Sequence, residues 1–502
     1  MSSTRTVVET PARLTGRLGT IGIVFMVVAA AAPLTVIGGN MPLALGVGNG
    51  AGAPVGFLIA ATILLLFSVG FVAMTPHVRE AGAFFSYVTL GLGERAGMGI
   101  AAVALVAYTA IQAGIYGYIG WAIDDTVRFY GGPTVPWPVY SMLTLVIVAF
   151  LGYRHIDLSA KVLGVALVAE IGIVLVLDVA ILVNPGPSGV TMQSFDPGTF
   201  ADGAIGVAVL FALTGFIGFE STAVFRDEAY RPEKTVPRAT YTAVLLIGGF
   251  YAFTCWAFVV AVGPDAIANV AQRTLDGNAN MLLDTTHDQL GGFGRDIVNV
   301  LLLTSLFACV LSFHNVIARY QFVLAGMRVL PRRLATVHPK HHSPSFSSVV
   351  QTCTAIVLVA IFAAFGVDPL VGVFGSMAGV ATVGMIILML TTSIAVLAFF
   401  SRNSEARAGR RVRTLIIPAI ATAGLIGGMI LVLSNFTLVT SGSIGLSVGL
   451  ALVPFAAFVG GWFIGKQRSA EVERKAPAEV AAISGLERGR MKDRDPLTHE
   501  EM

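Results

Sequence analysis

The chain has 502 residues, of which 55% are hydrophobic and only 12% are charged, and its formal net charge is +3. A soluble globular protein carries about 25% charged residues, so this composition excludes a soluble domain and indicates a membrane protein. The small net charge excludes nucleic acid as a partner. Cys255, Cys309 and Cys353 all lie in apolar segments, which excludes a disulfide framework or a zinc site. We expect membrane lipid as the surroundings, and neither a cofactor nor a resident metal.

About twelve segments are long and apolar enough to cross a bilayer, which takes roughly 20 residues per helix. This pattern predicts an all-α membrane protein. A twelve-helix membrane domain covers residues 18–466, between an N-terminal tail (1–17) and a polar C-terminal tail (467–502) that we expect to be disordered. The predicted spans are residues 18–43, 52–75, 94–121, 137–153, 159–183, 203–225, 239–262, 293–326, 346–366, 370–400, 412–434 and 443–465.

Lysine and arginine residues set the predicted orientation, because short cytoplasmic loops carry most of them. Loops 327–345 and 401–411 are strongly basic, whereas loops 184–202 and 435–442 contain no lysine or arginine. This bias places both termini in the cytoplasm and fits an even number of spans. We therefore expect a multi-pass protein of the plasma membrane.

Two of the predicted spans contain residues that interrupt helices. Span one has Pro33 in its middle, and proline removes a backbone hydrogen bond and clashes with the preceding turn. Span six contains Gly215 and Gly218 ahead of Glu220, and each glycine costs about 1 kcal/mol in a helix relative to alanine. A pair of interrupted spans at corresponding positions is typical of transporters built from inverted repeats, whose substrate site lies at the breaks.

Three segments carry a recognisable signature. Residues 79–93 read REAGAFFSYVTLGLG, and residues 318–331 read ARYQFVLAGMRVLP. The third and most specific segment follows the second break and contains Gly218, Glu220, Ser221, Glu228, Ala229, Pro232, Thr235, Val236, Pro237, Arg238 and Ala239. In these segments the chain resembles the amino acid permeases of the amino acid–polyamine–organocation (APC) superfamily, over residues 15–466. The resemblance implies a LeuT-like fold, with a five-plus-five inverted repeat, broken helices 1 and 6, two further helices and alternating access.

The resemblance also implies where substrate binds. Family members usually have a glycine-rich break in span one, which binds a substrate carboxylate through backbone amides. This chain has Pro33 there, which lacks an N–H, so only Leu34 and Thr35 can donate. In span five, Glu170 stands where many relatives have a lysine. The expected substrate-binding residues are Pro33, Leu34, Thr35, Gln112, Thr214, Gly215, Phe216 (as a lid), Ile217, Gly218 and Ser312.

Several of these residues have a second interpretation. We expect Glu220 and Glu170 to serve in proton coupling or gating, because acids inside a membrane are costly and rarely idle. Glu220 can instead hydrogen-bond the backbone at the break, and Glu170 can pair with a nearby donor. Gln112 can instead join neighbouring helices. Ser312 is one of three polar residues close together in span eight, of which we expect one to line the cavity.

Together these features predict a secondary active transporter that imports an amino acid by alternating access, coupled to protons, with sodium as the alternative ion. The second interpretation is a permease for polyamines or other organic amines, or an amino acid/amine exchanger, since Glu170 and Glu220 attract the amino end of a substrate. An enzyme is not expected, because no nucleophile is paired with a base and no phosphate-binding loop is present. A channel or a receptor would differ in lacking stoichiometric, saturable uptake.

Overall fold

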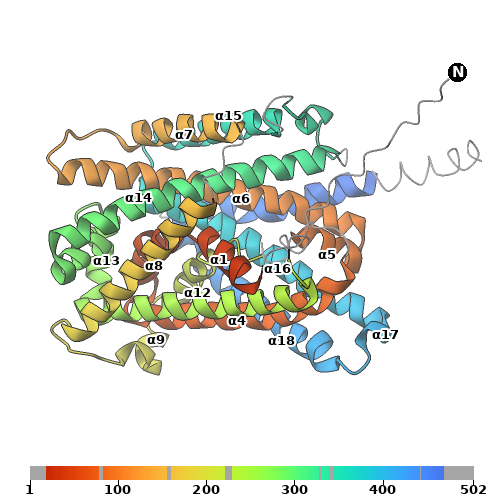
Figure 1. Ribbon diagram of the computed structural model, residues 1–502, viewed down its shortest axis with the longest axis horizontal. Coiled ribbons are helices and arrows are strands. Elements are labelled where there is room, and N and C mark those ends of the chain that lie inside the picture. Colours follow the sequence, from red (N-terminus) through yellow and green to blue (C-terminus); the bar gives the residue numbers. More distant parts are fainter. Residues whose placement is uncertain are drawn as a thin grey trace, which may run out of the picture.

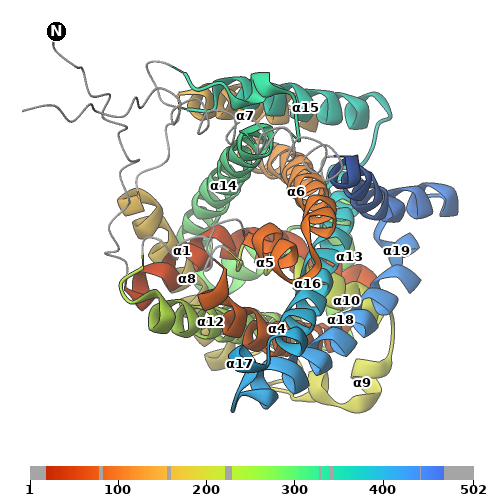
Figure 2. The ribbon, with the colours of Figure 1, turned by 90° about the vertical axis from the view of Figure 1, so that its right-hand side faces the viewer.

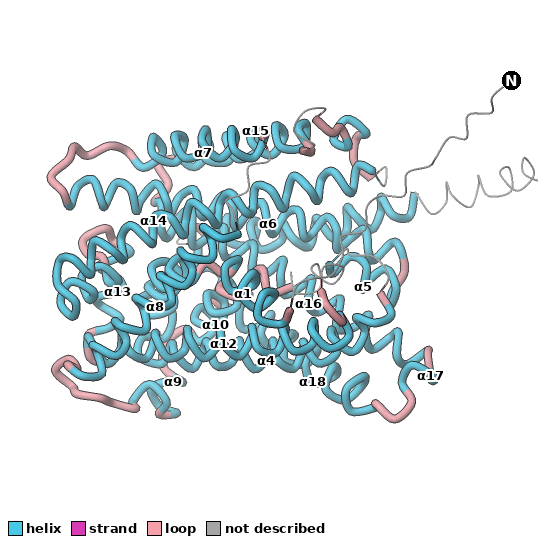
Figure 3. Tube along the Cα trace, viewed as in Figure 1, coloured by secondary structure: helices cyan, strands magenta, loops and turns pink. Residues whose placement is uncertain are grey.

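The computed structural model describes residues 19–78, 83–154, 160–220, 229–326, 329–338, 343–440 and 442–467. Within these ranges helices joined by loops make up the chain (Figure 3). Nine described segments are long and apolar enough to cross a membrane, and one of them, Thr20–His77, covers the first two predicted spans. The shorter apolar helices Trp137–Tyr153 and Ile205–Thr214 correspond to spans four and six. Each predicted span therefore falls on an apolar helix, and the chain is an all-helical, multi-pass membrane protein.

The last apolar helix is Ile444–Gln467. Apart from Gln467, both predicted tails lie outside the described residues. The other elements are α1 (Thr20–Ala30), α2 (Pro33–Thr35), η1 (Val36–Asn40), α3 (Met41–Leu43), η2 (Ala44–Asn49), η3 (Gly50–Gly52), α4 (Ala53–Met74), η4 (Thr75–His77), α5 (Ala83–Leu92), α6 (Glu94–Phe129), α7 (Trp137–Tyr153), α8 (Ala160–Val183), η5 (Gln193–Phe195), α9 (Pro197–Ala201), α10 (Ile205–Thr214), α12 (Pro232–Val262), α13 (Ile267–Leu275), α14 (Met281–Gly326), η7 (Arg332–Ala335), α15 (Ser345–Ala364), η8 (Pro369–Gly375), α16 (Ser376–Arg402), α17 (Ser404–Arg407), η9 (Val412–Ile416), α18 (Ile417–Ser434) and α19 (Phe436–Thr440).

The helices form a bundle in which most axes run in one general direction (Figure 1). Helices α7 and α15 lie side by side along one edge, next to α6 and α14, in both views (Figures 1 and 2). Helices α4, α12 and α18 lie on the opposite side, where α4 packs against the other two. Helices α1, α10 and α16 lie between the two groups (Figure 2). The two interrupted spans are therefore in the interior of the bundle.

The outer surfaces of the helices are apolar. In α7, five large hydrophobic side chains that recur every one to four residues are at least 44% exposed: Val139, Leu143, Val146, Ile147 and Phe150. In water such a stripe would be unfavourable, whereas in a bilayer it contacts hydrocarbon. The exposure pattern supports the assignment of these helices as membrane spans.

Glycines allow close helix packing in the interior. A Cβ atom added to Gly384 of α16 would lie 2.8 Å from the Cβ of Ala107 in α6. A Cβ atom added to Gly248 of α12 would lie 2.4 Å from the Cβ of Ala61 in α4. Small residues at such contacts let the helix backbones approach, which strengthens van der Waals packing in a membrane. These two contacts hold the helices that surround the breaks.

The structure differs from the predicted boundaries in several places. Helix α6 ends at Phe129 rather than at residue 121. Helix α12 begins at Pro232 rather than at residue 239, because its first turn is polar and does not register as apolar. Helix α14 is interrupted at Gly291, whose φ of 72° and ψ of −177° are not helical. The part after this kink agrees with the predicted span 293–326, and residues 281–290 form an additional helical segment before it that was not predicted. Residues 83–92, within a segment expected to be a loop, form helix α5.

Candidate functional site

The first break separates α1 from α2. Ala32 has φ 46° and ψ 73°, a left-handed conformation that non-glycine residues rarely adopt. Pro33 follows as the first residue of α2, where its missing N–H costs no helical hydrogen bond. The break thus lies at Ala31 and Ala32, just before the proline at which the sequence predicts it. The carbonyl of Ala31 accepts a hydrogen bond from the hydroxyl of Tyr251 in α12, at 3.2 Å.

Glu170 of α8 reaches the start of the second half of span one. Its Oε2 accepts a hydrogen bond from the hydroxyl of Ser305 in α14, at 3.0 Å, and a longer one from the backbone N–H of Leu34, at 3.5 Å. The side chain is only 5% exposed, so these protein donors take the place of water. Glu170 therefore joins α8, α14 and α2, and it holds one of the two backbone donors that the sequence offers to a substrate carboxylate.

A hollow of about 720 Å³ lies beside Glu170, between α1, α8 and α14. Its walls are largely apolar and include Ala29, Val165 and Val300, with Glu170 and Ser305 among the polar residues. Val165 and Val300 are 68% and 60% exposed, so they belong to the outer surface of the bundle. The hollow thus extends from the outer surface of the bundle to the buried residue Glu170.

The second break follows α10. The chain leaves the helix at Thr214, and residues 215–220 form consecutive turns. Gly218 has φ 107°, a conformation that glycine adopts without a steric penalty. The hydroxyl of Thr214 lies 2.5 Å from that of Thr382 in α16, which ties the end of α10 to α16. The predicted interruption of span six is therefore present, and residues 221–228 of the predicted loop lie outside the described residues.

Glu220 is buried at the end of this break, with 4% of its surface exposed. Its Oε1 accepts a hydrogen bond from the Tyr108 hydroxyl of α6 at 2.6 Å, and its Oε2 accepts one from the Gly218 N–H at 3.0 Å. The Tyr108 ring in turn lies 6.1 Å from the ring of Phe313 in α14. Glu220 therefore links the second break to α6, and both of its carboxyl oxygens act as acceptors.

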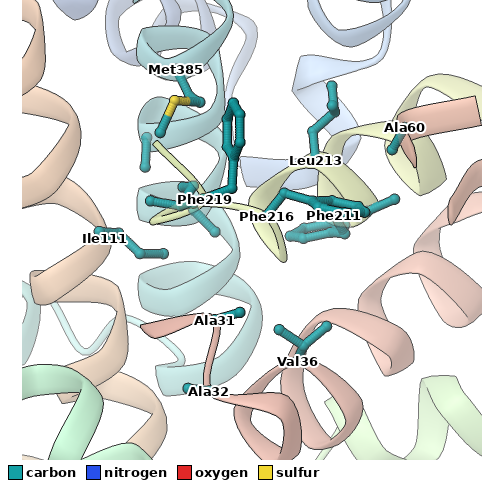
Figure 4. Packing of buried hydrophobic residues seen from close by; sticks show 14 of the residues in the cluster. Ala31, Ala32, Val36, Ala60, Ile111, Phe211, Leu213, Phe216, Phe219 and Met385 are labelled. Atoms are coloured by element: carbon teal, nitrogen blue, oxygen red, sulfur yellow. The ribbon is translucent and has the colours of Figure 1, made fainter. Parts of the chain in front are cut away.

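The two breaks lie next to each other. A Cβ atom added to Gly215 would lie 3.1 Å from Cγ1 of Val36, one turn into the second half of span one. The Phe216 ring packs edge to face on Tyr251, with 6.3 Å between ring centres. Figure 4 shows Ala31 and Val36 of the first break below Phe216 of the second. Of the predicted substrate-binding residues, those of spans one and six are thus brought together.

Two hydroxyl groups near the first break have no hydrogen-bond partner among the described residues. They are Oγ1 of Thr35 and the phenolic oxygen of Tyr118 in α6, and both side chains are at most 5% exposed. Tyr118 lies against the span-one backbone one turn after Thr35, since a Cβ atom added to Gly38 would be 2.3 Å from its hydroxyl. Buried polar groups are nearly always hydrogen-bonded, so these two hydroxyls are candidates for contact with water or a polar ligand.

Gln112 and Ser312 are not part of this arrangement. Gln112 donates to the backbone carbonyl of Val310 in α14 at 3.3 Å and accepts from Gln351 in α15 at 2.6 Å. It therefore joins three helices, as its second interpretation holds. Ser312 lies on an exposed face of α14, and its neighbour His314 bonds the Ser348 hydroxyl of α15 at 2.9 Å. Neither residue forms a described hydrogen bond to the two breaks, and the role of both in substrate binding stays a prediction.

Sequence reasoning missed four residues that contact the site: Tyr108, Tyr251, Ser305 and Thr382. Tyr108 had a usable signal, because it lies one helical turn before Gln112 on the same face of span three. The others are single hydroxyl residues in long apolar helices, with no local pattern that distinguishes them from packing residues. No group of three or more histidine, cysteine or acidic side chains that could hold a metal occurs in the described ranges.

Comparison with known proteins identifies the family. A family model described as amino acid permease matches residues 18–464. The chain is 23% identical over 268 residues to the serine/threonine exchanger SteT of Bacillus subtilis, covering 52% of this chain and 56% of the relative. It is 24% identical over 311 residues to the branched-chain amino acid permease BcaP of the same organism, covering 59% and 64%. The match thus spans less than two thirds of each of these relatives.

A third relative is matched over a longer range. It is an uncharacterized transporter of Mycobacterium tuberculosis, 23% identical over 418 residues, or 75% of this chain and 79% of the relative. The family-model match covers nearly the whole membrane domain and confirms the resemblance seen in the sequence. Proteins of this family are transporters and not enzymes. The chain therefore belongs to the amino acid permease family of the APC superfamily.

Proposed function

We propose that this permease imports an amino acid across the plasma membrane by alternating access. The proposal rests on one observation above all: the two interrupted spans lie next to each other, with the buried Thr35 hydroxyl unpartnered beside them among the described residues. Interrupted helices are tolerated in a bilayer only where their free backbone groups meet protein or a ligand. Spans one to five and six to ten would form the two inverted repeats, which alternately open the site to each side.

The substrate class follows from the groups at the breaks. An amino acid would place its carboxylate near the N–H groups of Leu34 and Thr35 and its ammonium near an acid. The second candidate is a polyamine or another organic amine, because Glu170 already contacts the Leu34 N–H and offers a negative charge to an ammonium group. A substrate carboxylate would have to displace Glu170 from that donor.

A competition assay distinguishes these two classes. An amino acid and its decarboxylated amine are compared as competitors of the same radiolabelled substrate in proteoliposomes that contain the purified protein. The amino acid proposal predicts that the free amino acid competes better. Equal or better competition by the amine would assign the site to amines. Counterflow of the labelled substrate in the same vesicles would separate a carrier from a channel.

Glu220 is the proposed coupling residue, and its hydrogen bonds support this role. Both carboxyl oxygens accept hydrogen bonds, so a proton added to Oε1 would turn this acceptor into a donor and force the Tyr108 hydroxyl proton to reorient. Proton uptake would thereby replace a hydrogen bond to a charged group, between the second break and α6, with a weaker neutral one. Glu220→Gln should flatten the pH dependence of net uptake and leave exchange of bound substrate partly intact.

Two control experiments for proton coupling at Glu220 concern Glu170, the other buried acid, and sodium, the alternative coupling ion. If Glu220→Gln keeps the wild-type pH profile, the proton is carried elsewhere, and Glu170→Gln becomes the variant to measure. Sodium coupling would appear instead as uptake that falls when choline replaces sodium at constant pH. Proton coupling and sodium coupling can therefore be distinguished in one preparation of vesicles.

The proposed orientation has both termini in the cytoplasm. Ser188 and Ser404 are exposed and lie in loops that the charge bias assigns to opposite sides. In a Cys353→Ser background, which removes the exposed native cysteine, Ser188→Cys should react with a membrane-impermeant thiol reagent in intact cells, and Ser404→Cys should not. The reverse pattern would overturn the orientation.

A further inference from the structure

The segment between α16 and α18 forms a basic hollow at one end of the bundle. The hollow has a volume of about 820 Å³ and is lined by residues 404 and 407–413. Arg407, Arg410, Arg411 and Arg413 contribute four guanidinium groups, and Ala408 and Gly409 occupy little space between them. Of the residues 402–413, only Glu405 is acidic. The hollow is thus open, strongly positive and built by one short stretch of chain.

These arginines are not neutralised by the rest of the described protein. Throughout the described ranges, the one ion pair within 4.0 Å joins Arg128 and Asp124, far along the sequence from this segment. Arg407 donates to the backbone carbonyls of Phe400 and Ser401, both at 3.4 Å, which holds its side chain against α16. The side chains of Arg410, Arg411 and Arg413 are exposed, so their charges are available to an external anion.

The hollow lies where the chain enters the hydrocarbon region. Val412, Ile416 and Ile420 are 56%, 53% and 51% exposed and recur every four residues through η9 into α18. Residues at this spacing lie on one face of a helix, so an outward apolar stripe begins among the arginines. The exposed apolar side chains of η9 and α18 could contact the acyl chain of a phospholipid, and the guanidinium groups at the start of η9 could bind its phosphate.

We propose that this arginine hollow binds the phosphate headgroup of an anionic phospholipid of the surrounding bilayer. The planar guanidinium group pairs with phosphate oxygens through two hydrogen bonds, which an ammonium group cannot do. The lipid tail would follow Val412 and Ile416 along α18. The π-helix η9 packs against α4, α16 and α18. Arg402, at the end of α16, donates to the Gly91 carbonyl of α5 at 3.3 Å. The bound headgroup would therefore lie where α4, α5, α16 and α18 meet.

Native mass spectrometry of the full-length protein tests the proposal. The protein is titrated with phosphatidylglycerol, with phosphatidylcholine as the neutral lipid, and with soluble glycerol 3-phosphate as the same phosphate ester without tails. The double variant Arg410→Gln/Arg411→Gln should bind phosphatidylglycerol about thirtyfold more weakly, since each basic residue near an anionic surface contributes a little over fivefold in affinity. Its affinity for phosphatidylcholine should not change.

The matched control is Arg332→Gln/Arg333→Gln, which removes two adjacent exposed arginines in η7 and changes the net charge equally. This pair should leave phosphatidylglycerol affinity within about twofold of the wild type. An equal loss in both double variants would mean unspecific attraction by a basic surface and would overturn the proposal. Binding of glycerol 3-phosphate as tightly as of the lipid would assign the hollow to a soluble phosphate ester instead. If the glutamine pair does not fold, Arg410→Lys/Arg411→Lys should still lose affinity, because lysine keeps the charge but not the paired hydrogen bonds.

Discussion

Tyr108→Phe removes a single hydroxyl group and leaves the aromatic ring in place. The lost hydroxyl donates to Glu220 at 2.6 Å, and the ring contacts with Phe313 and Tyr320, at 6.1 and 6.4 Å between centres, do not involve it. Tyr108 and Glu220 are 6% and 4% exposed, so water is not at hand to replace the donor. After the change Glu220 keeps the hydrogen bond from the Gly218 N–H on its other oxygen.

The expected magnitude depends on whether Glu220 is charged. Hydrogen bonds to charged groups contribute about 1.5–3 kcal/mol and neutral ones about 0.5–1.5 kcal/mol. Between helices within a membrane, measured couplings average about 0.6 kcal/mol and reach about 1.7 kcal/mol. The oxygens of Tyr108 and Glu220 are only 2.6 Å apart and both side chains are buried, so their hydrogen bond is short and shielded from water. We expect a coupling free energy near the upper membrane value, about 1.5 kcal/mol.

A double-mutant cycle measures this coupling. The free energy of unfolding is determined in detergent for the wild type, Tyr108→Phe, Glu220→Gln and the double variant. Tyr108→Phe should lower stability by about 2 kcal/mol in the wild type, but by only about 0.5 kcal/mol in the Glu220→Gln background, where the acceptor is a neutral amide. Tyr320→Phe is the control, since no described hydrogen bond joins the Tyr320 hydroxyl to Glu220. A coupling indistinguishable from zero would refute the argument that this bond holds the second break to α6.

Two further changes test the helix packing. Gln351→Leu should lower the free energy of unfolding by about 1–3 kcal/mol, because it leaves the fully buried Gln112 Oε1 without the donor that lies 2.6 Å away; a loss below about 0.5 kcal/mol would contradict this. Gly384→Val should lower it by about 1–3 kcal/mol, because the new Cβ would lie 2.8 Å from the Cβ of Ala107, and Ala107→Gly in the same protein should restore part of the loss if that contact is the cause.

The membrane spans could be predicted because hydrocarbon imposes a length and a composition on every helix that crosses it. The prediction of residues 137–153 coincides with α7, and that of 159–183 agrees with α8, whose description begins at Ala160. The same criterion failed at the start of α12, where residues 232–238 are helical but polar. Apolar length detects only the part of a helix that lies in hydrocarbon, so polar extensions escape it.

The break in span one could be predicted only approximately. Pro33 correctly indicated an interruption. Because proline is well accommodated as the first residue of a helix, the irregular residues come before Pro33 and the helix begins at Pro33 itself. Alanine has no intrinsic preference for the left-handed conformation found at Ala32. Tertiary contacts such as the hydrogen bond from Tyr251 to the Ala31 carbonyl stabilise it, and these depend on how distant helices pack.

The hydrogen-bond donors of Glu220 and Glu170 could not be predicted from the sequence either, because they too depend on how distant helices pack. The sequence identified Glu220 and Glu170 as unusual, because an acid inside an apolar span is conspicuous by itself. Their donors Tyr108 and Ser305 lie 112 and 135 positions away in the chain. Only the arrangement of α6 and α14 around the breaks brings them together.

Two backbone groups at the first break already have partners, and this has a consequence for the strength of substrate binding. The Ala31 carbonyl is bonded to Tyr251 and the Leu34 N–H to Glu170, so a substrate that uses either group exchanges one hydrogen bond for another. Each displaced bond subtracts about 0.5–1.5 kcal/mol from the gain, which lowers affinity by up to about tenfold per bond. A carrier must release its cargo on the far side in every cycle, and weak net binding shortens that step because dissociation then has a smaller barrier to cross. The internal partners at the break thus favour rapid turnover over tight capture.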